Sequence, residues 1–307
     1  MTCFDAKDMY LKWMQDIADS QDIYGGHVEH TAPFYGGGGG PGGWGGAIVF
    51  VPYTYYKHYG EKEVLKKYYR NMCKYLEYME SHSEDSLVVR SEKGGWCLGD
   101  WCAPMDLYKP EHHTMSRVLI PETYVNTVLF IKQMKMVIEL AKIIGKEELT
   151  SPLPELIKKA SDMVNIAYYS PMTHCYCGDV QGANCLALDA GLGDEKTLKM
   201  TVEKYADREC FDTGIVATDV LPRILFDSGN AQLAFDLMTS RKLPSFGYMM
   251  EHGATTLWED WLPERSLNHP MFGALTRYLF TYLLGITQAQ DSAGFEKMQK
   301  IMLRVLL

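Results

Sequence analysis

The stretch Ala47-Ile-Val-Phe-Val-Pro-Tyr-Thr-Tyr-Tyr-Lys-His-Tyr59 is apolar on almost every side when it is wound as a helix, and Gly60 follows it as a stop. The next stretch, Glu63–Ser81, is amphipathic. Its one apolar face holds Leu65, Tyr69, Met72, Leu76 and Met79. A helix that is apolar all round is buried on all sides, whereas a one-sided helix covers the outside of a core. The two stretches therefore predict an inner helix followed by an outer helix.

A helical period runs through most of the chain, and short extended pieces are expected at Ser86–Arg90 and Tyr248–Thr256. Eleven helices are predicted, at Asp5–Gln21, Ala47–Tyr59, Glu63–Ser81, Pro121–Gly145, Pro154–Tyr169, Asp179–Leu192, Asp194–Arg208, Ala217–Ser228, Asn230–Thr239, Met271–Leu284 and Ala293–Leu306.

Apolar helices alternate with charged helices along the chain. The turns from an inner to an outer helix are short, such as Gly191-Leu-Gly193, and the segments that lead into inner helices are long, glycine-rich and aromatic. If helix directions alternate, the long segments gather at one end. The sequence thus predicts an all-α toroid of helical hairpins, a single domain over residues 1–307, with its site at the long-loop end.

The composition of the chain limits which classes of binding partner and which cellular location are expected. The 307 residues carry a net charge of −9, which argues against nucleic acid or an anionic membrane surface as the partner. No basic segment precedes an apolar one near Met1, and no window of about 18 apolar residues occurs. The eight cysteines have no framework spacing, and Cys175-x-Cys177 is shorter than a C-x-x-C motif. We expect reduced thiols and a cytoplasmic protein.

The loop Gly253-Ala-Thr-Thr-Leu-Trp-Glu-Asp-Trp261 and the adjoining Ser266-Leu-Asn-His269 place indoles beside carboxylates. Indole faces stack on the C–H faces of pyranose rings, and carboxylates handle hydroxyls, protons and water. This loop therefore indicates a sugar site, and the longer segment Leu243–Trp261 carries the acidic residues Glu251, Glu259 and Asp260.

Two further loops repeat the theme. In Tyr35–Ala47, glycines surround Trp44, and the alternatives are a flexible linker or a phosphate loop, although the GxxxxGK[ST] pattern is absent. We expect the glycines to let the backbone approach a ligand on which Trp44 stacks. Gly99-Asp100-Trp101 again pairs a carboxylate with an indole, and the alternative for Asp100 is a turn-forming role.

Other chemistries are less well supported. His112-His113 alone does not make a metal site, and the G-x-S-x-G pattern of a serine nucleophile is absent. We expect neither a metal nor a cofactor. Carboxylate acid–base chemistry remains.

The chain resembles the catalytic domain of glycoside hydrolase family 78, the α-L-rhamnosidases, from Lys12-Trp13 to about Ile286. The segments that carry the resemblance are Gly43-Trp44-Gly45, Gly99-Asp100-Trp101, Phe211–Ile215, Leu243–Tyr248, Gly253–Glu259 and Ser266–His269. The resemblance implies an (α/α)6 barrel, a six-hairpin toroid, that hydrolyses terminal α-L-rhamnosides with inversion and without an organic cofactor.

The resemblance also implies roles for residues. Glu259 matches the general base, Trp44 and Trp101 match aromatic residues of the rhamnose pocket, and His269 matches a histidine that contacts the sugar. Asp100, beside Trp101, is a further candidate for substrate binding. Trp258 and Trp261 either form walls of the pocket or orient Glu259.

Inverting hydrolysis uses a second carboxyl group as the general acid. In the family, this acid lies in an arginine- and glutamate-containing motif upstream of the region that matches Lys12-Trp13, and this motif is not found in this chain. We expect a domain truncated at both ends, without its first helix, slow or inactive alone on aryl α-L-rhamnosides. The alternatives are a catalytically disabled carbohydrate-binding relative, a different inverting glycosidase on the same fold, or an acid role for Asp100 or Glu251. An apolar face around Trp13 and Ala47–Tyr59 would then favour a homo-oligomer.

Overall fold

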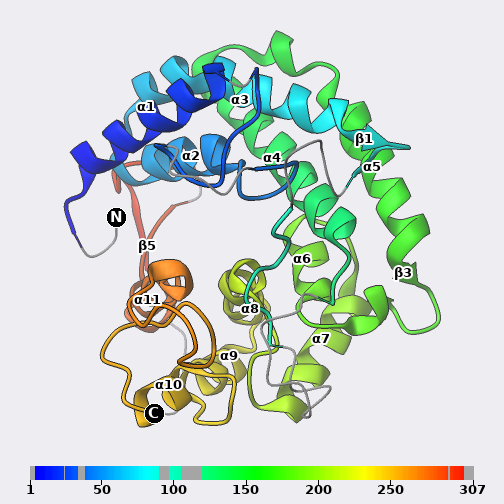
Figure 1. Cartoon of the computed structure of the whole chain (residues 1–307), viewed down its shortest axis with the longest axis vertical. Coiled ribbons are helices and arrows are strands. Elements are labelled where there is room, and N and C mark those ends of the chain that lie inside the picture. The colour runs from blue at the N-terminus through cyan, green and yellow to red at the C-terminus, as the bar shows by residue number, and fades with distance from the viewer. Residues whose placement is uncertain are drawn as a thin grey trace. The chain divides into compact units, whose positions relative to one another are not determined.

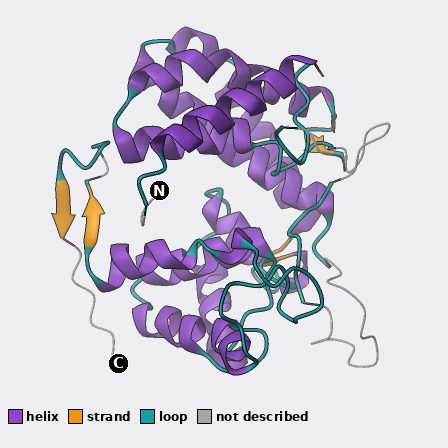
Figure 2. Cartoon of the chain, turned by 60° about the vertical axis from the view of Figure 1, so that its left-hand side comes forward, coloured by secondary structure: helices purple, strands orange, loops and turns teal. Residues whose placement is uncertain are grey.

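The computed structural model describes residues 4–23, 25–33, 39–89, 97–104, 119–289 and 291–300. These residues form eleven α-helices, a few short 3-10 and π segments, and three two-stranded sheets. Figure 2 shows how strongly helix dominates. None of the helices described is long and apolar enough to cross a membrane. The chain packs into two compact units.

The first unit comprises Met1–Gly99, Glu122–Ala167 and Gln288–Met298. Its elements are α1 (Lys7–Ile23), α2 (Ala47–Tyr59), α3 (Lys62–Ser81), the hairpin β1 (Ser83–Glu84) and β2 (Leu87–Val88), α4 (Glu122–Ile144), a 3-10 turn (Glu147–Thr150) and α5 (Leu153–Tyr168). The helix α2 packs against α1, α3 and α4, which Figure 1 shows as neighbours in blue to green.

The inner and outer roles predicted for α2 and α3 are confirmed. In α2, Ile48, Val49 and Tyr55 are fully buried, whereas α3 buries one face and leaves residues such as Lys66 exposed. Gly60 ends α2 in the left-handed conformation (φ 76°), which glycine adopts without strain. Helix α1 packs against α2, in which Phe50, Val51 and Tyr53 remain partly exposed, and Trp13 on α1 is exposed.

The second unit comprises Asp100–Pro121, Tyr168–Thr287 and Gln299–Leu307. Its elements are the hairpin β3 (Tyr169–Ser170) and β4 (Cys175–Tyr176), α6 (Ala183–Asp189), α7 (Glu195–Arg208), α8 (Ile215–Asp227), α9 (Ala231–Thr239), α10 (Phe246–Glu251), α11 (Leu275–Tyr278) and a π segment (Leu279–Leu283). At its centre α8 packs against α6, α9 and α11. Asp194 starts α7 with a capping box that Thr197 completes.

Two predicted elements are wrong. Residues 248–251, expected to be extended, belong to α10, because the Ser245 hydroxyl accepts the Tyr248 N–H at 3.0 Å and starts a helix there. The helix expected at Ala293–Leu306 is absent from its described part. Gly294 and Phe295 have positive φ angles, and Met298–Lys300 forms β6, which pairs with β5 (Ile286–Gln288). Residues 301–306 lie outside the described part.

Two predicted helices are shorter than expected. The helix predicted over Asp179–Leu192 begins only at Ala183, because Gly178, Asp179 and Gln181 have positive φ angles that interrupt a right-handed helix. The helix predicted over Met271–Leu284 is divided into a 3-10 turn (Pro270–Phe272), α11 and the π segment. The number of helices thus agrees only because one prediction was wrong and α10 was missed. The extended piece at Ser86–Arg90 is confirmed for Leu87–Val88, and Arg90 is outside the described residues.

Candidate active site

The glycine-rich loop of the first unit packs on helices rather than leaving open space beside its glycines. A Cβ atom at Gly43 would lie 2.2 Å from Leu129 Cδ1, and one at Gly46 would lie 2.1 Å from Gln133 Nε2. These glycines are needed because the loop touches α4, so the expected reason for them, the approach of a ligand, is corrected at these positions. Residues 34–38 of the loop lie outside the described part.

Trp44 projects from this loop and is half-buried. Its ring centroid lies 6.3 Å from that of His30, and its Nε1 is shielded from solvent without a hydrogen-bond partner among the described residues. The Trp44 indole is therefore partly exposed and lies beside the His30 imidazole.

In the second unit, the Trp261 side chain is buried in an aromatic cluster. Its ring stacks on Phe211 (centroids 5.5 Å apart, 17° between planes) and packs against Phe246 and Phe272 at 5.4 and 4.4 Å. Its Nε1–H donates to the carbonyl oxygen of Thr213 at 2.9 Å. Trp258 is also buried. Of the two roles left open for these indoles, burial favours orienting the Glu259 loop over contacting a sugar.

Asp100 caps helix α8 from a distant part of the sequence. Its fully buried carboxylate accepts the N–H groups of Gly214 at 2.8 Å, Val216 at 2.8 Å and Ala217 at 3.2 Å. Burial raises the pKa of Asp100 to about 6, although the three N–H donors act in the opposite direction. The Asp100 carboxylate thus has a structural role as the cap of α8, and its lack of exposed surface argues against the expected contact with substrate.

The same burial speaks against Asp100 as a replacement acid. The other candidate, Glu251, lies in α10 and pairs with Arg241 at 2.9 Å on the surface. The Asp100 carboxylate is thus inaccessible to a substrate, whereas the Glu251 side chain is 46% exposed and remains a candidate proton donor.

Trp101 follows the cap and is half-buried. Its carbonyl oxygen accepts the N–H of Ile215 at 2.8 Å, so its backbone is fixed to the start of α8. A Cβ atom at Gly214 would lie 2.1 Å from the Asp100 carbonyl oxygen and 2.4 Å from that of Trp101. The motif Phe211–Ile215 therefore connects the Trp101 loop to the Trp261 side chain, through the backbone of Ile215 and of Thr213. The preceding part of the Trp101 loop, residues 90–96, is outside the described residues, as is His112-His113.

Glu259 lies on a loop that folds back on itself. The Glu259 N–H donates to the Ser266 carbonyl oxygen at 2.8 Å, and the His269 N–H donates to that of Leu257 at 2.8 Å. The Glu259 side chain is 20% exposed, and its Oε2 lies 3.8 Å from His269 Nδ1. The sequence prediction that Glu259 and His269 belong to one site is thus matched by their proximity.

Arg265 is the residue that sequence reasoning missed. Its Nη1 lies 3.5 Å from Glu259 Oε1, its Nε lies 3.9 Å from Asp260 Oδ2, and its guanidinium carbon lies 5.0 Å above the Trp101 ring. The sequence signal was available, because Arg265 is the one Lys or Arg between Leu257 and His269, a stretch with three carboxylates.

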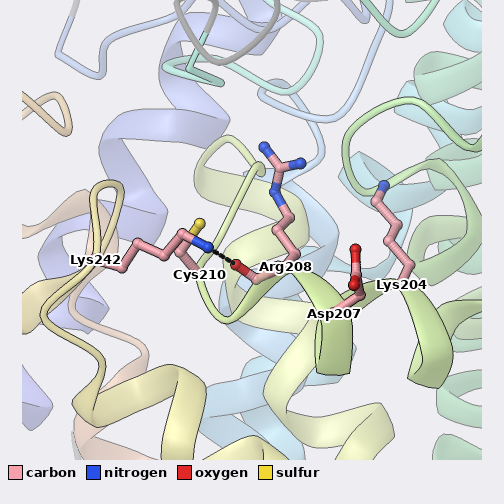
Figure 3. A pocket seen from close by; sticks show the side chains of 5 residues that line it. All are labelled: Lys204, Asp207, Arg208, Cys210 and Lys242. Carbon is pink, nitrogen blue, oxygen red and sulfur yellow. Dashed lines mark hydrogen bonds between the residues drawn. The ribbon is translucent and has the colours of Figure 1, made fainter.

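A separate pocket of about 330 Å³ lies at the end of α7 and is lined by Lys204, Asp207, Arg208, Cys210 and Lys242 (Figure 3). Lys204 pairs with the buried Asp212 at 2.9 Å, and Lys242 donates to the Arg208 carbonyl oxygen at 2.8 Å. We assign no ligand to this pocket, because the protein's own acceptors engage these two cations. Among the described residues, no group of three or more His, Cys, Asp or Glu side chains could hold a metal ion.

Comparison with known proteins decides the family. The family model of the bacterial alpha-L-rhamnosidase six-hairpin glycosidase domain matches residues 1–283. The chain belongs to this family. It is similar to an α-L-rhamnosidase of Streptomyces avermitilis (28% identity over 303 residues, 93% of this chain) and to one of Formosa agariphila (24%, 95% of this chain). The chain spans 27% and 32% of the length of these two relatives.

Solved structures agree. The S. avermitilis α-L-rhamnosidase complexed with L-rhamnose matches 98% of this chain and 29% of its own, with a TM-score of 0.84 at 25% identity. The α-L-rhamnosidase from Dictyoglumus thermophilum matches 96% of this chain and 33% of its own, with a TM-score of 0.82 at 27% identity. The predicted resemblance and the all-α fold of the six-hairpin, (α/α)6-barrel type are confirmed.

Proposed function

We propose that this domain hydrolyses terminal α-L-rhamnosides with inversion and that Glu259 is the general base. Family membership supports the reaction class, and the similar S. avermitilis enzyme has been solved with L-rhamnose. The observation that carries the role of Glu259 is its combination of a fixed backbone with a partly exposed carboxylate beside His269.

In an inverting reaction the base removes a proton from water while that water attacks the anomeric carbon from the face opposite the leaving group. The base must therefore be ionised, held in one place and open to a water molecule. The Glu259 backbone is bonded to Ser266 and its carboxylate is 20% exposed, which supports this role, whereas the Asp100 carboxylate is fully buried.

The substrate class in this proposal is a rhamnose-containing glycoside or oligosaccharide. In the second unit, His269 would donate to or accept from a sugar hydroxyl, and the face of the Trp101 indole opposite Arg265 would contact C–H groups of the pyranose. Trp44, in the first unit, stays a candidate for substrate binding. Three buried residues would not contact the sugar but would fix the loops that carry Glu259 and Trp101, namely Trp258, Trp261 and Asp100.

Two measurements on the purified chain test the proposal. Calorimetric titration with L-rhamnose, compared with L-fucose, reports binding, and hydrolysis of 4-nitrophenyl α-L-rhamnoside, compared with the α-L-fucoside, reports turnover. We expect L-rhamnose to bind in preference to L-fucose, and the rhamnoside to be turned over in preference to the fucoside but slowly, because the family's general-acid motif is not found in this chain. Binding without turnover would favour the carbohydrate-binding alternative. The absence of both binding and turnover would contradict the proposal.

A further inference from the structure

Arg265 connects the two loops of the second unit that carry proposed site residues. Its guanidinium faces the Glu259 carboxylate at 3.5 Å and the Asp260 carboxylate at 3.9 Å, and it covers the Trp101 ring at 5.0 Å. Its side chain is 20% exposed, the same fraction as that of Glu259. A long, flexible side chain is thereby held from three directions.

The Trp101 end of this connection is fixed independently. The Trp101 carbonyl oxygen accepts the Ile215 N–H, and the neighbouring Asp100 carboxylate caps the same turn of α8. The indole is therefore a stable platform for a guanidinium, which stacks on aromatic faces better than an ammonium does.

The Glu259 end has freedom that Arg265 restricts. The backbone of Glu259 is held by Ser266, but a glutamate side chain has three rotatable bonds between backbone and carboxylate. Arg265 Nη1 faces Oε1, while His269 Nδ1 and the Ser266 N–H face Oε2 at 3.8 and 3.4 Å. With a different partner on each oxygen, the plane of the carboxylate is defined.

We propose that Arg265 is a positioning residue that fixes the Glu259 carboxylate relative to Trp101, so that the base meets its water in one orientation. The proposal rests on the function proposed for Glu259. It assigns Arg265 no contact with the substrate. Loss of the guanidinium should therefore lower kcat and leave KM nearly unchanged, because misplacing a reacting group by about 1 Å costs on the order of 100-fold in rate.

The kinetic test compares R265A and R265K with the control R241A, which removes an exposed arginine from its pair with Glu251 in the same unit. We expect R265A to lower kcat by about 10- to 100-fold, added guanidinium ion to restore part of that loss, and R265K to remain below wild type because an ammonium lacks the planar fork. Wild-type kcat in R265A or in R265K overturns the proposal, as does a loss of equal size in R241A.

A second readout keeps the test independent of turnover. R265A should change the tryptophan emission of the protein, and the change should vanish in a W101F background, because the guanidinium lies over Trp101. If E259Q turns over like wild type, or if the wild-type protein itself does not turn over, the proposed function fails, and the fluorescence comparison alone decides the role of Arg265. If R265A changes the tryptophan emission equally in the wild-type and W101F backgrounds, or changes it in neither, the role proposed for Arg265 is overturned.

Discussion

The Asp100 carboxylate accepts the Gly214 N–H across 2.8 Å and so caps α8 from 114 residues away in the sequence. The residue after Asp100 is Trp101, and the residue before Gly214 is Thr213, whose carbonyl oxygen holds Trp261. Both loops of the candidate site in the second unit therefore depend on one helix terminus, and several consequences of this arrangement are measurable.

The charge of Asp100 should make stability fall with rising pH. Burial raises its pKa from 3.8 to about 6, so the folded chain binds this proton more tightly than the unfolded chain does. Its contribution to the free energy of unfolding is complete below about pH 4 and is lost by about pH 6, a change on the order of 3 kcal/mol. Urea denaturation at several pH values should show this slope in wild type and not in D100N.

Asp194 provides a contrast of opposite sign. It caps α7 at the surface, where the Thr197 N–H in particular lowers its pKa below 3.8. Its contribution is present above about pH 4 and is lost as the pH falls through the lowered value. D194N should therefore remove stability at neutral pH and little at low pH.

Identical pH slopes in wild type and D100N between pH 4 and 6 would contradict the role given to Asp100.

Gly214 should tolerate no side chain. In G214A the new methyl group would meet two backbone carbonyl oxygens, Asp100 O at 2.1 Å and Trp101 O at 2.4 Å, so the loop or the helix must move. We expect a loss of about 1–3 kcal/mol or more in the free energy of unfolding. The control G253A has open space but a left-handed φ of 88°, which should cost about 1 kcal/mol. A G214A protein as stable as wild type would refute the close approach.

Trp261 should affect stability more than substrate affinity. W261F keeps an aromatic ring among Phe211, Phe246 and Phe272 but leaves the Thr213 carbonyl oxygen without the indole N–H. A buried acceptor without a donor costs about 1–3 kcal/mol. Thermal denaturation should show this loss, and KM for a rhamnoside should change little. A large rise in KM with unchanged stability would instead make Trp261 a contact of the sugar.

His269 should contribute to sugar affinity. If it bonds a sugar hydroxyl, H269A should weaken L-rhamnose binding by about three- to tenfold, the range of one neutral hydrogen bond. The matched control is H252A, since His252 is exposed at the other end of the same loop and stacks on Tyr248. Equal affinities of H269A and wild type in calorimetry would remove His269 from the site.

Several helices could be predicted because α3 and α7 have apolar faces that repeat every three to four residues and α2 is apolar on almost every side. α2, α3 and α7 were found almost to the residue, and the Gly60 stop was correct. The prediction failed where this signal is short or ambiguous. The six residues of α10 are too few to show a period, and the apolar residues near Met298 fit a strand as well as a helix.

The site was predictable at the level of residue types and not of contacts. Indoles beside carboxylates pointed to a sugar, and Glu259 and His269 lie together as expected. The roles of Asp100 and Arg265 depend on partners that are distant in sequence, at Gly214 and Trp101 respectively. Local sequence patterns contain no information about such partners, so a buried cap and a substrate contact look alike.

The most direct test of the central claim is the hydrolysis of 2,4-dinitrophenyl α-L-rhamnoside by wild type and E259Q. Dinitrophenolate leaves without protonation, so the rate reports on the base alone. We predict a kcat about 10²- to 10⁴-fold lower in E259Q, a wild-type rate in the control E264Q from the same loop, and β-L-rhamnose as the first product seen by NMR. Wild-type turnover in E259Q, or α-L-rhamnose as the first product, would contradict the account.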